Sequence, residues 1–263
     1  MSLLEVKNLT FEYGTGKFRN LALDDVSFSL EKGEILSIIG HTGSGKSTLV
    51  QTLNGLLKPK SGTVCLDGEN IFSSTDLLKK ARFRVGLVFQ YPEYQLFEES
   101  VFKDISFGPK NMGLDNEEIG RRVFEASSFV GLRSELLGKS PFELSGGEKR
   151  RTAIAGILAM EPEILILDEP TAGLDPGSGR NLIENLIKLR DKNGTTIIIV
   201  SHSMENTAKI SDKIMVMNVG KCEMFGTPKE IFSQEERLSE LSLGIPQITR
   251  IMKSLKQRGC TVR

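Results

Sequence analysis

A chain of 263 residues has room for one large domain, or for one domain that carries an insert and an extension. Lysine and arginine balance aspartate and glutamate at 34 each, which argues against the net positive charge typical of broad nucleic-acid binding. No apolar run approaches the ~20 residues that span a bilayer, and the first residues lack the features of a signal peptide. We therefore expect a chain that crosses no membrane by itself. The cysteines Cys65, Cys222 and Cys260 are far apart and lack metal-ligand spacing, which favours reduced, incidental thiols of a cytosolic protein.

Apolar patterning predicts an α/β core. Short strands bounded by turns alternate with helical segments, which is typical of a largely parallel, buried sheet. The expected strands are residues 4–9, 23–30, 35–39, 85–89, 164–167 and 195–200. The expected core helices are residues 46–56 and 177–191.

Residues 91–161 change in character and predict a helical insert. This stretch carries helix-like segments at 117–130 and 147–160, separated by loops that contain Pro109 and Pro141. We therefore divide the chain into one domain, residues 1–226 with this insert, and a C-terminal extension, residues 227–263. The extension is a candidate dimer-forming element.

A phosphate-binding loop is expected between the strand at 35–39 and the helix after it. The pattern G-x-x-x-x-G-K-[ST] is matched by Gly40, His41, Thr42, Gly43, Ser44, Gly45, Lys46 and Ser47. Glycines let backbone N–H groups turn inward around phosphates, and the helix N-terminus adds partial positive charge. Lys46 would reach the β- and γ-phosphates, and Ser47 would offer its hydroxyl to Mg²⁺. The alternative is a glycine-rich turn that only resembles such a loop.

Two carboxylates follow the apolar strand at 164–167. The end of a parallel strand is where α/β proteins hold ligands. Asp168 suits a Mg²⁺ ion that keeps its water shell, and Glu169 suits a general base that polarises an attacking water. The alternative is a solvated acidic pair.

The segment Leu144-Ser145-Gly146-Gly147-Glu148 stands before a predicted helix that Ser145 can cap. In this segment the sequence resembles the ABC ATPase family, whose signature lies between the two motifs described above. The resemblance covers residues 3–226. It implies a P-loop core with a mostly parallel sheet, an antiparallel β subdomain, a helical subdomain and a short C-terminal extension.

The resemblance also implies ATP and Mg²⁺ as ligands and assigns further residues. Tyr13 would stack on adenine, and Thr48 would complete the phosphate loop. Gln90 would contact Mg²⁺ and, together with Lys46, Glu169 and His202, take part in catalysis; residues 172–175 match the family's D-loop. Each has a plainer interpretation: Tyr13 as a strand-end aromatic, Gln90 as a surface residue, His202 as a helix cap, His41 as a variable loop position.

The signature implies a dimer. In this family Ser145, Gly146 and Gly147 would lie against the γ-phosphate of the ATP held by the opposite cassette, and Glu148 would belong to the same nucleotide site. One chain would then complete neither site, so the function would require two cassettes related by a pseudo-two-fold axis.

Residues 89–97, with the pattern Phe-Gln-x-Pro-Glu-x-Gln-Leu-Phe, resemble the Q-helix of energy-coupling factor transporter ATPases. Residues 98–101, 107–109 and 140–144 resemble the second-type A subunit of these transporters. That resemblance implies uptake of vitamins or of cobalt or nickel ions, a related second A subunit, and indirect contact with a substrate-binding S component. It places the protein on the cytoplasmic face of the bacterial membrane. A transmembrane T component would dock at Phe89–Phe97, where Leu96 and Phe97 stand beside acidic Glu93, Glu98 and Glu99 and suit a basic amphipathic helix. The alternative is an ordinary insert core with an acidic rim.

Two other functions are open. A soluble ABC ATPase acting on DNA or the ribosome would be expected to carry a long coiled coil or a second cassette, and neither pattern occurs in this sequence. A regulatory ATP-binding module without turnover would be favoured by the loss of Glu169 or His202, and both are present. Neither function would involve the membrane subunits that a transporter requires.

Overall fold

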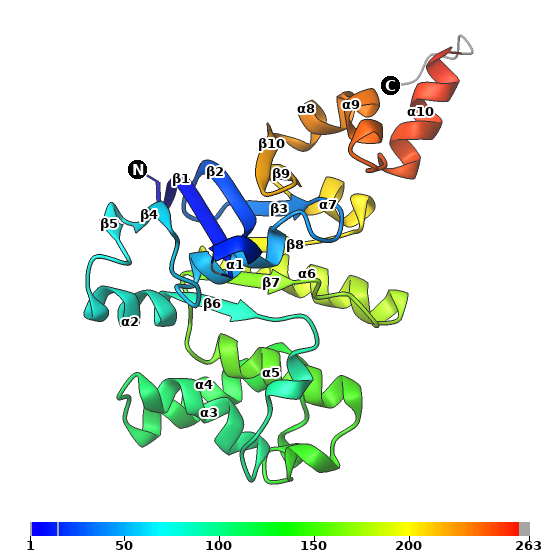
Figure 1. Cartoon of the computed structure of the whole chain (residues 1–263). Coiled ribbons are helices and arrows are strands. Elements are labelled where there is room, and N and C mark those ends of the chain that lie inside the picture. Colours follow the sequence, from blue (N-terminus) through cyan, green and yellow to red (C-terminus); the bar gives the residue numbers. More distant parts are fainter. Residues whose placement is uncertain (1, 15, 258–263) are drawn as a thin grey trace.

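The computed structural model describes residues 2–14 and 16–257, so Cys260 and the end of the predicted extension lie outside the described residues. Two sheets form the upper part of the molecule and helices form the lower part (Figure 1). The helices α8, α9 and α10 extend from the upper side (Figure 1). The predicted α/β class, with a P-loop core and a helical insert, is confirmed.

The larger sheet has the strand order β10-β9-β3-β8-β7-β6. Five of its strands are parallel, and β10 pairs antiparallel with β9 at the edge. The strands are β3 Ile35–Ile39, β6 Val85–Val88, β7 Ile164–Asp168, β8 Thr196–Val200, β9 Lys213–Asn218 and β10 Lys221–Gly226. Because parallel strands share one carboxyl edge, the loops after β3, β6, β7 and β8 lie at the same edge.

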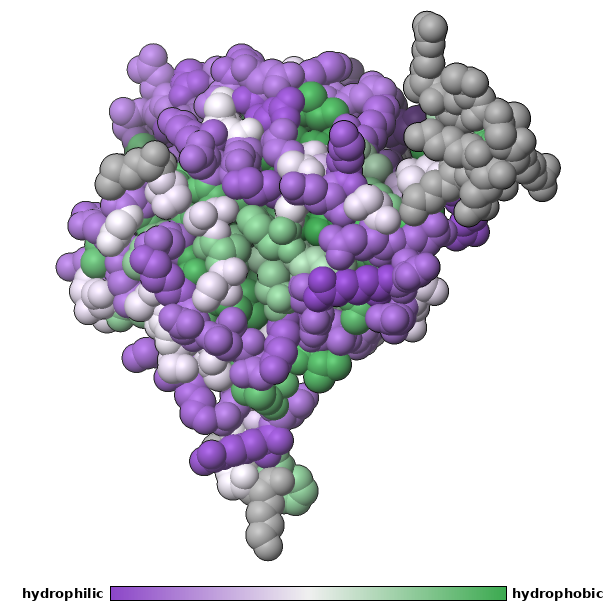
Figure 2. Space-filling model, turned by 90° about the horizontal axis from the view of Figure 1, so that it is seen from above, coloured by the Kyte–Doolittle hydropathy of each residue, from purple (hydrophilic) through white to green (hydrophobic). Residues whose placement is uncertain are grey.

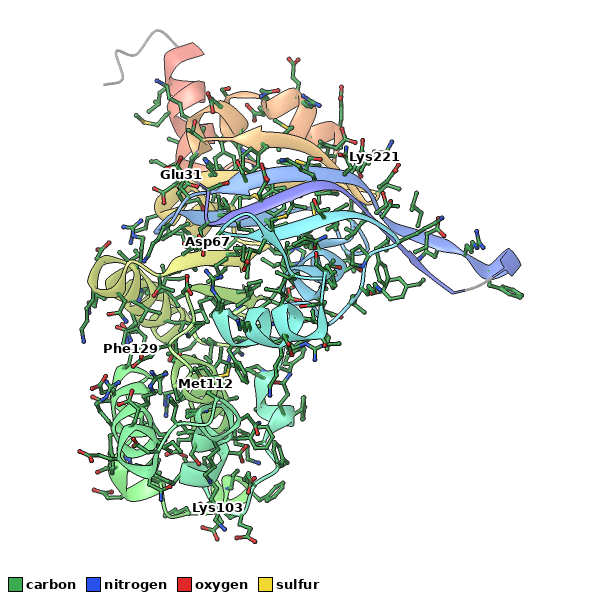
Figure 3. All side chains as sticks on the ribbon, turned by 90° about the vertical axis from the view of Figure 1, so that its left-hand side faces the viewer. Glu31, Asp67, Lys103, Met112, Phe129 and Lys221 are labelled. Carbon is green, nitrogen blue, oxygen red and sulfur yellow. The ribbon has the colours of Figure 1, made fainter. Side chains whose placement is uncertain are left out.

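The smaller sheet is antiparallel, with the order β2-β1-β4-β5. Its strands are β1 Leu4–Tyr13, β2 Asn20–Leu30, β4 Ser61–Leu66 and β5 Glu69–Asn70. The β1–β2 hairpin, with the short helix η1 Gly16–Phe18, projects beyond the rest of the molecule (Figure 3). The sequence predicted β1 only to residue 9, because a bulge near Asn8, whose φ is 50°, interrupts the alternation.

Alternate residues of the central strands face two cores. Leu36 and Ile38 of β3 pack toward the antiparallel sheet, as do Ile164 and Ile166 of β7. Leu165 and Leu167 of β7 face the helices of the insert and α6. This period of two explains why strands buried on both faces are almost entirely apolar.

The remaining core helices are α1 Lys46–Leu53, α2 Thr75–Arg84, α6 Pro176–Asn193 and α7 Met204–Ile210. The helix predicted at 46–56 ends three residues early. Asn54 is its C-terminal cap, and Gly55 follows with φ of 74°, a left-handed conformation that ends helices.

The insert runs between β6 and β7. It contains η2 Pro92–Gln95, α3 Val101–Asn111, α4 Asn116–Phe129, η3 Ser134–Leu136, η4 Pro141–Glu143 and α5 Gly146–Leu158. The prediction of a loop around Pro109 was wrong, because Pro109 lies inside α3 and is buried. Proline removes a hydrogen bond from a helix interior, and the packing of α3 against α4 and α5 compensates for that loss.

The extension contains α8 Pro228–Ser233, α9 Glu235–Glu240 and α10 Gln247–Gln257. Ile231, Phe232 and Leu238 pack with residues of β3, β9 and β10 in a third core cluster. Within residues 2–14 and 16–257, no helix is both long and apolar enough to cross a membrane. The face of the molecule seen from above is mostly hydrophilic, with hydrophobic patches between (Figure 2).

Candidate active site

The sheet edge collects the loops that carry the predicted site. The phosphate loop follows β3, Gln90 follows β6, Glu169 follows β7, and His202 follows β8. These segments are far apart in sequence, and the order of the parallel strands brings them together.

Glycines shape the phosphate loop. Gly40, Gly43 and Gly45 have φ values of 155°, 83° and 99°, which residues with side chains adopt at a cost. A Cβ atom on Gly40 would lie 2.3 Å from the carbonyl oxygen of Met217, and one on Gly45 would lie 2.4 Å from that of Ala22. The loop is therefore packed tightly against the strands on both sides of it.

Lys46 lies inside the phosphate loop. Its side chain donates hydrogen bonds to the carbonyl oxygens of Gly40 and His41, both at 2.8 Å, and the residue is only 6% exposed. Burial lowers the pKa of its ammonium, while the carboxylates of Glu169 and Asp168 partly oppose that shift. A buried cation that donates hydrogen bonds to backbone carbonyl oxygens is suited to bind an anion.

Asp168 and Ser47 meet at the foot of the loop. Asp168 is 7% exposed, and burial raises the pKa of its carboxyl, which a hydrogen bond from Ser47 and the charges of Lys46 and His202 partly oppose. A carboxylate and a hydroxyl are hard oxygen ligands of the kind Mg²⁺ prefers. The residues present therefore fit a magnesium ion.

The Glu169 carboxylate is held from two sides. Gln90 donates a hydrogen bond from Nε2 to one carboxylate oxygen at 3.0 Å, and Nε2 of His202 lies 2.9 Å from the other. The backbone of Glu169 has φ of 50°, a conformation that costs about 1–3 kcal/mol outside glycine. Its N–H donates to the carbonyl oxygen of Val200. Strain of this kind is found where a side chain must be aimed, and here three loops converge on one carboxylate.

Tyr13 stands beside the helix that follows the loop. Its hydroxyl lies 3.2 Å from Oγ1 of Thr48, its ring meets that of Phe11 edge-on, and it is 42% exposed. The exposed part of the ring is available to a planar ligand.

We expect Tyr13→Ala to weaken ATP binding by about 1 kcal/mol through lost stacking. Affinities for ATP and for inorganic triphosphate, measured by calorimetry on the full chain, separate stacking from phosphate contacts. Only ATP should lose affinity, and Tyr94→Ala, which removes an aromatic ring that is 85% exposed, should change neither. Equal loss for both ligands would assign Tyr13 to packing.

The signature residues lie at the N-terminus of α5. Ser145 caps this helix, and the Glu148 side chain accepts a hydrogen bond from the Ser145 backbone in return, an arrangement that lowers the pKa of Glu148. A Cβ atom on Gly146 would meet nothing within 4 Å. Within the described part of the chain, no hydrogen bond or ion pair joins these residues to the phosphate loop. The structure thus brings together the predicted residues of the sheet edge and leaves the signature apart from them.

Arg150 is a residue that sequence reasoning missed. It is 6% exposed and donates hydrogen bonds to the backbone carbonyl oxygens of Glu169, Pro170 and Ala172. The signature helix is therefore tied to the segment that carries Glu169. The charged run after the signature is a weak signal, because such runs usually lie on a solvated face.

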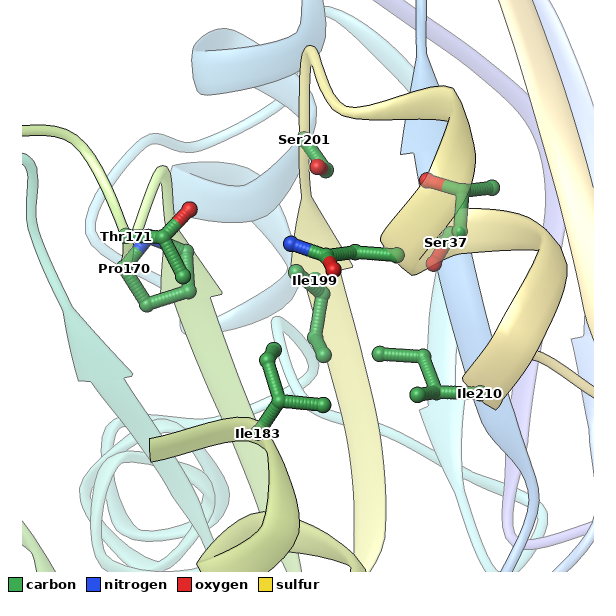
Figure 4. Close-up of a pocket in the computed structure, with 9 residues that line it drawn as sticks. Ser37, Pro170, Thr171, Ile183, Ile199, Ser201 and Ile210 are labelled. Atoms are coloured by element: carbon green, nitrogen blue, oxygen red, sulfur yellow. The ribbon is translucent and has the colours of Figure 1, made fainter. Parts of the chain in front are cut away.

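A small cavity lies behind the site. Side chains from β3, β8, α6 and α7 surround it together with Pro170 and Thr171 (Figure 4). Its volume of about 10 Å³ is that of roughly one water molecule. The cavity is therefore too small to hold a nucleotide.

A larger groove of about 280 Å³ lies between α2, α3, α5 and the segment after η2. Leu96 and Phe97 line it, and the Phe97 ring, 59% exposed, meets Phe107 edge-on at 5.0 Å. Asp104 also lines it, and burial raises the pKa of that carboxyl. Glu93 does not line the groove, in contrast to the acidic flank expected from the sequence, and its Oε2 is buried.

Comparisons with known proteins extend over nearly the whole chain. The family model described as ABC transporter matches residues 23–172. The energy-coupling factor transporter ATP-binding protein EcfA2 of Caldanaerobacter subterraneus subsp. tengcongensis is 55% identical over 260 residues, which cover 98% of this chain and 91% of that relative. EcfA2 of Clostridioides difficile is 54% identical over 263 residues, with the same coverages.

Two solved structures are also similar to this chain. The structure of cbiO1 from Clostridium perfringens, described as part of the ABC transporter complex cbiONQ, has a TM-score of 0.79 and 40% identity and covers 96% of this chain and 99% of its own. The dimeric post-hydrolysis state of the ATP-binding cassette MJ0796, bound to ADP and Pi, has a TM-score of 0.78 and 29% identity. It covers 86% of this chain and 98% of its own.

Proposed function

Because the chain belongs to the ABC transporter family, and within it to the energy-coupling factor transporter ATP-binding proteins, we propose that it energises an importer of vitamins or transition-metal ions by binding and hydrolysing ATP on the cytoplasmic face of the membrane. The observation that carries the proposal is the Glu169 carboxylate, held between Gln90 and His202 beside the phosphate loop. The names of the relatives favour transport over a soluble role on DNA or the ribosome.

Each residue has a task in hydrolysis. Lys46 and the backbone N–H groups of residues 40–48 bind the phosphates. Ser47, Asp168 and Gln90 would hold Mg²⁺, which supplies positive charge to the phosphate oxygens when bound. Glu169 orients the attacking water and accepts its proton as general base. His202, on the other oxygen of that carboxylate, fixes its direction.

A second cassette completes the site. Ser145, Gly146, Gly147 and Glu148 make no contact with the phosphate loop of their own chain, and the N-terminus of the 13-residue helix α5 is open to an anion. We therefore assign these residues to the nucleotide of a related, non-identical A subunit. The dimeric cassette MJ0796 supports this assembly.

The extension adds a surface to this dimer. Helix α10 carries Ile248, Ile251 and Leu255 at the spacing of one helix face, and they are 64%, 54% and 37% exposed. An exposed apolar face of this kind is typical of an interaction site. We assign it to contact with the second cassette.

The groove is the proposed docking site of the transmembrane T component. The chain would contact the substrate-binding S component only indirectly, through the T component. The apolar floor formed by Leu96, Phe97 and Phe107 suits an amphipathic helix. Asp104 lines the groove, whereas Glu99 is not among the lining residues and pairs with Lys103. The docking segment predicted at Phe89–Phe97 thus contributes its last three residues to the groove lining.

We expect Leu96→Asp to abolish co-purification with the T component, because it places an unpaired charge on an apolar docking surface at a cost of a few kcal/mol. The assay is a pull-down of the co-expressed, detergent-extracted complex, with ATP binding measured on the same variant. Phe124→Asp is the matched control, since Phe124 is an exposed aromatic of the same insert outside the groove. An intact pull-down by Leu96→Asp would remove the groove from the interface, and loss of ATP binding would show that Leu96 is structural core.

A further inference from the structure

The turn between β9 and β10 forms a wall against the phosphate loop. The Gly220 N–H donates a hydrogen bond to the carbonyl oxygen of Ser44 at 3.0 Å, and the Gly220 carbonyl accepts one from Asp24 at 2.9 Å. Gly40 of the phosphate loop also packs closely against the carbonyl of Met217, in the strand β9 that leads into this turn. The turn is therefore fixed both to the phosphate loop and to β2.

This turn carries local strain. Val219 has φ of 44° and is 69% exposed, although a β-branched residue strongly avoids positive φ. The exposed valine side chain does not explain this conformation. The two-residue hairpin turn does: Val219 and Gly220 connect the paired residues Asn218 and Lys221, and turns of this kind take positive φ at both central residues.

His41 makes the side-chain link between the two segments. Its Nδ1 lies 2.8 Å from the carbonyl oxygen of Thr42, and its Nε2 lies 2.9 Å from Oδ1 of Asn218, 177 residues away. A carbonyl oxygen only accepts hydrogen bonds, so Nδ1 must carry a proton. When the ring is charged, its Nε2 donates a hydrogen bond to the amide oxygen of Asn218. When the ring is neutral, the Asn218 amide can turn over so that its NH₂ group donates to Nε2. The link therefore persists in either state of the ring.

The position of the imidazole determines the direction of one peptide unit. In a trans peptide the C=O and the next N–H point in opposite directions. Because His41 holds the Thr42 carbonyl, the N–H of Gly43 points away from the imidazole. Gly43 has φ of 83° and lies in a turn that the Ser44 N–H closes on the His41 carbonyl oxygen at 3.2 Å. A Cβ atom on Gly43 would meet nothing within 4 Å, so packing does not fix the direction of the peptide unit between Thr42 and Gly43.

We propose that His41 and Asn218 form a clamp that holds the Gly43 N–H in its phosphate-binding direction before ATP arrives. His41 is thus a positioning residue of the nucleotide site, acting through its side chain as well as through its backbone. The proposal rests on the proposed ATP binding. Its energetic basis is preorganisation, since a loop already in the binding conformation loses less entropy when the ligand binds.

The test is a double-mutant cycle on the full chain, with ATP affinity measured by calorimetry. His41→Ala and Asn218→Ala should each raise the Kd about 3- to 10-fold, the effect of one hydrogen bond. The double variant should be no weaker than the weaker single variant, because both changes remove the same link. In the assembled transporter the loss should appear in the KM for ATP more than in kcat. A double variant whose Kd rises by the product of the two single effects would overturn the clamp.

Lys221→Ala is the matched control. Lys221 lies on the same hairpin and pairs with Asp24 while 58% exposed, so its removal should leave the Kd unchanged. If Lys221→Ala weakens ATP as much as Asn218→Ala does, the hairpin as a whole is responsible and the clamp is wrong.

Nitrogen-15 NMR of the His41 ring tests the clamp without nucleotide. A protonated Nδ1 that loses its distinct signal in Asn218→Ala supports the proposal, and a ring protonated only at Nε2 overturns it. If the unchanged chain binds no ATP, the proposed function fails and this spectrum alone decides the clamp.

Discussion

Glu169→Gln is expected to lower ATP turnover roughly 10²–10⁴-fold while ATP still binds. The amide keeps the shape of the carboxylate but cannot accept a proton from water. Its oxygen can still accept the hydrogen bond of Gln90, and its NH₂ group can donate to a neutral His202, so the geometry around it should survive. ATP-bound dimers should therefore accumulate. Turnover is measured on the assembled transporter by phosphate release, and dimers by size-exclusion chromatography.

The partner cassette must be inactivated in the same experiment, because its own site would otherwise mask the loss. Glu163→Gln is the control at the opposite end of β7, where Glu163 pairs with Arg84 on the far side from the phosphate loop. It should leave turnover near normal. Near-normal turnover by Glu169→Gln in a complex with an inactive partner site would remove Glu169 from the role of base.

The sequence predicted the buried parallel strands well. The bounds of β3 were predicted as the structure has them, because a five-residue run that is apolar except for Ser37, between a glycine turn and a glycine-rich loop, allows few other structures. The site followed from the same strands. Once Lys46, Gln90, Glu169 and His202 are placed after parallel strands, the shared edge of the sheet brings them together.

Elements whose stability comes from distant partners were not predictable. Strand β9 was missed because its register depends on pairing with β3, which lies far away in sequence, and β10 was missed with it because it pairs with β9. Helix α3 was missed because Pro109 argues locally against a helix that packing stabilises. Likewise, nothing near His41 in the sequence points to Asn218. Such contacts arise only from the tertiary fold.

Lys46→Ala is expected to raise the Kd for ATP about 10- to 100-fold, because it removes the cation whose charge-assisted hydrogen bonds to phosphate contribute about 1.5–3 kcal/mol. Lys60→Ala, which removes an exposed lysine paired with Glu12, should have no effect on the Kd. Calorimetry on both variants measures the difference. Equal Kd values for Lys46→Ala and the unchanged chain would place the phosphates elsewhere.

The same lysine predicts a pH dependence. Burial lowers the pKa of Lys46 from its ordinary 10.5, so in the free protein the ammonium loses its proton at a lower pH than an exposed lysine does. Phosphates favour the charged form, so ATP binding should raise that pKa again and require the protonated side chain. The chain should therefore bind ATP with its full affinity at neutral pH. That affinity should decline as the pH rises through the lowered pKa of Lys46, before exposed lysines lose their protons. Calorimetric titrations between neutral and alkaline pH measure this decline. It should be absent in Lys46→Ala, and a decline that persists in that variant would assign the effect to another group.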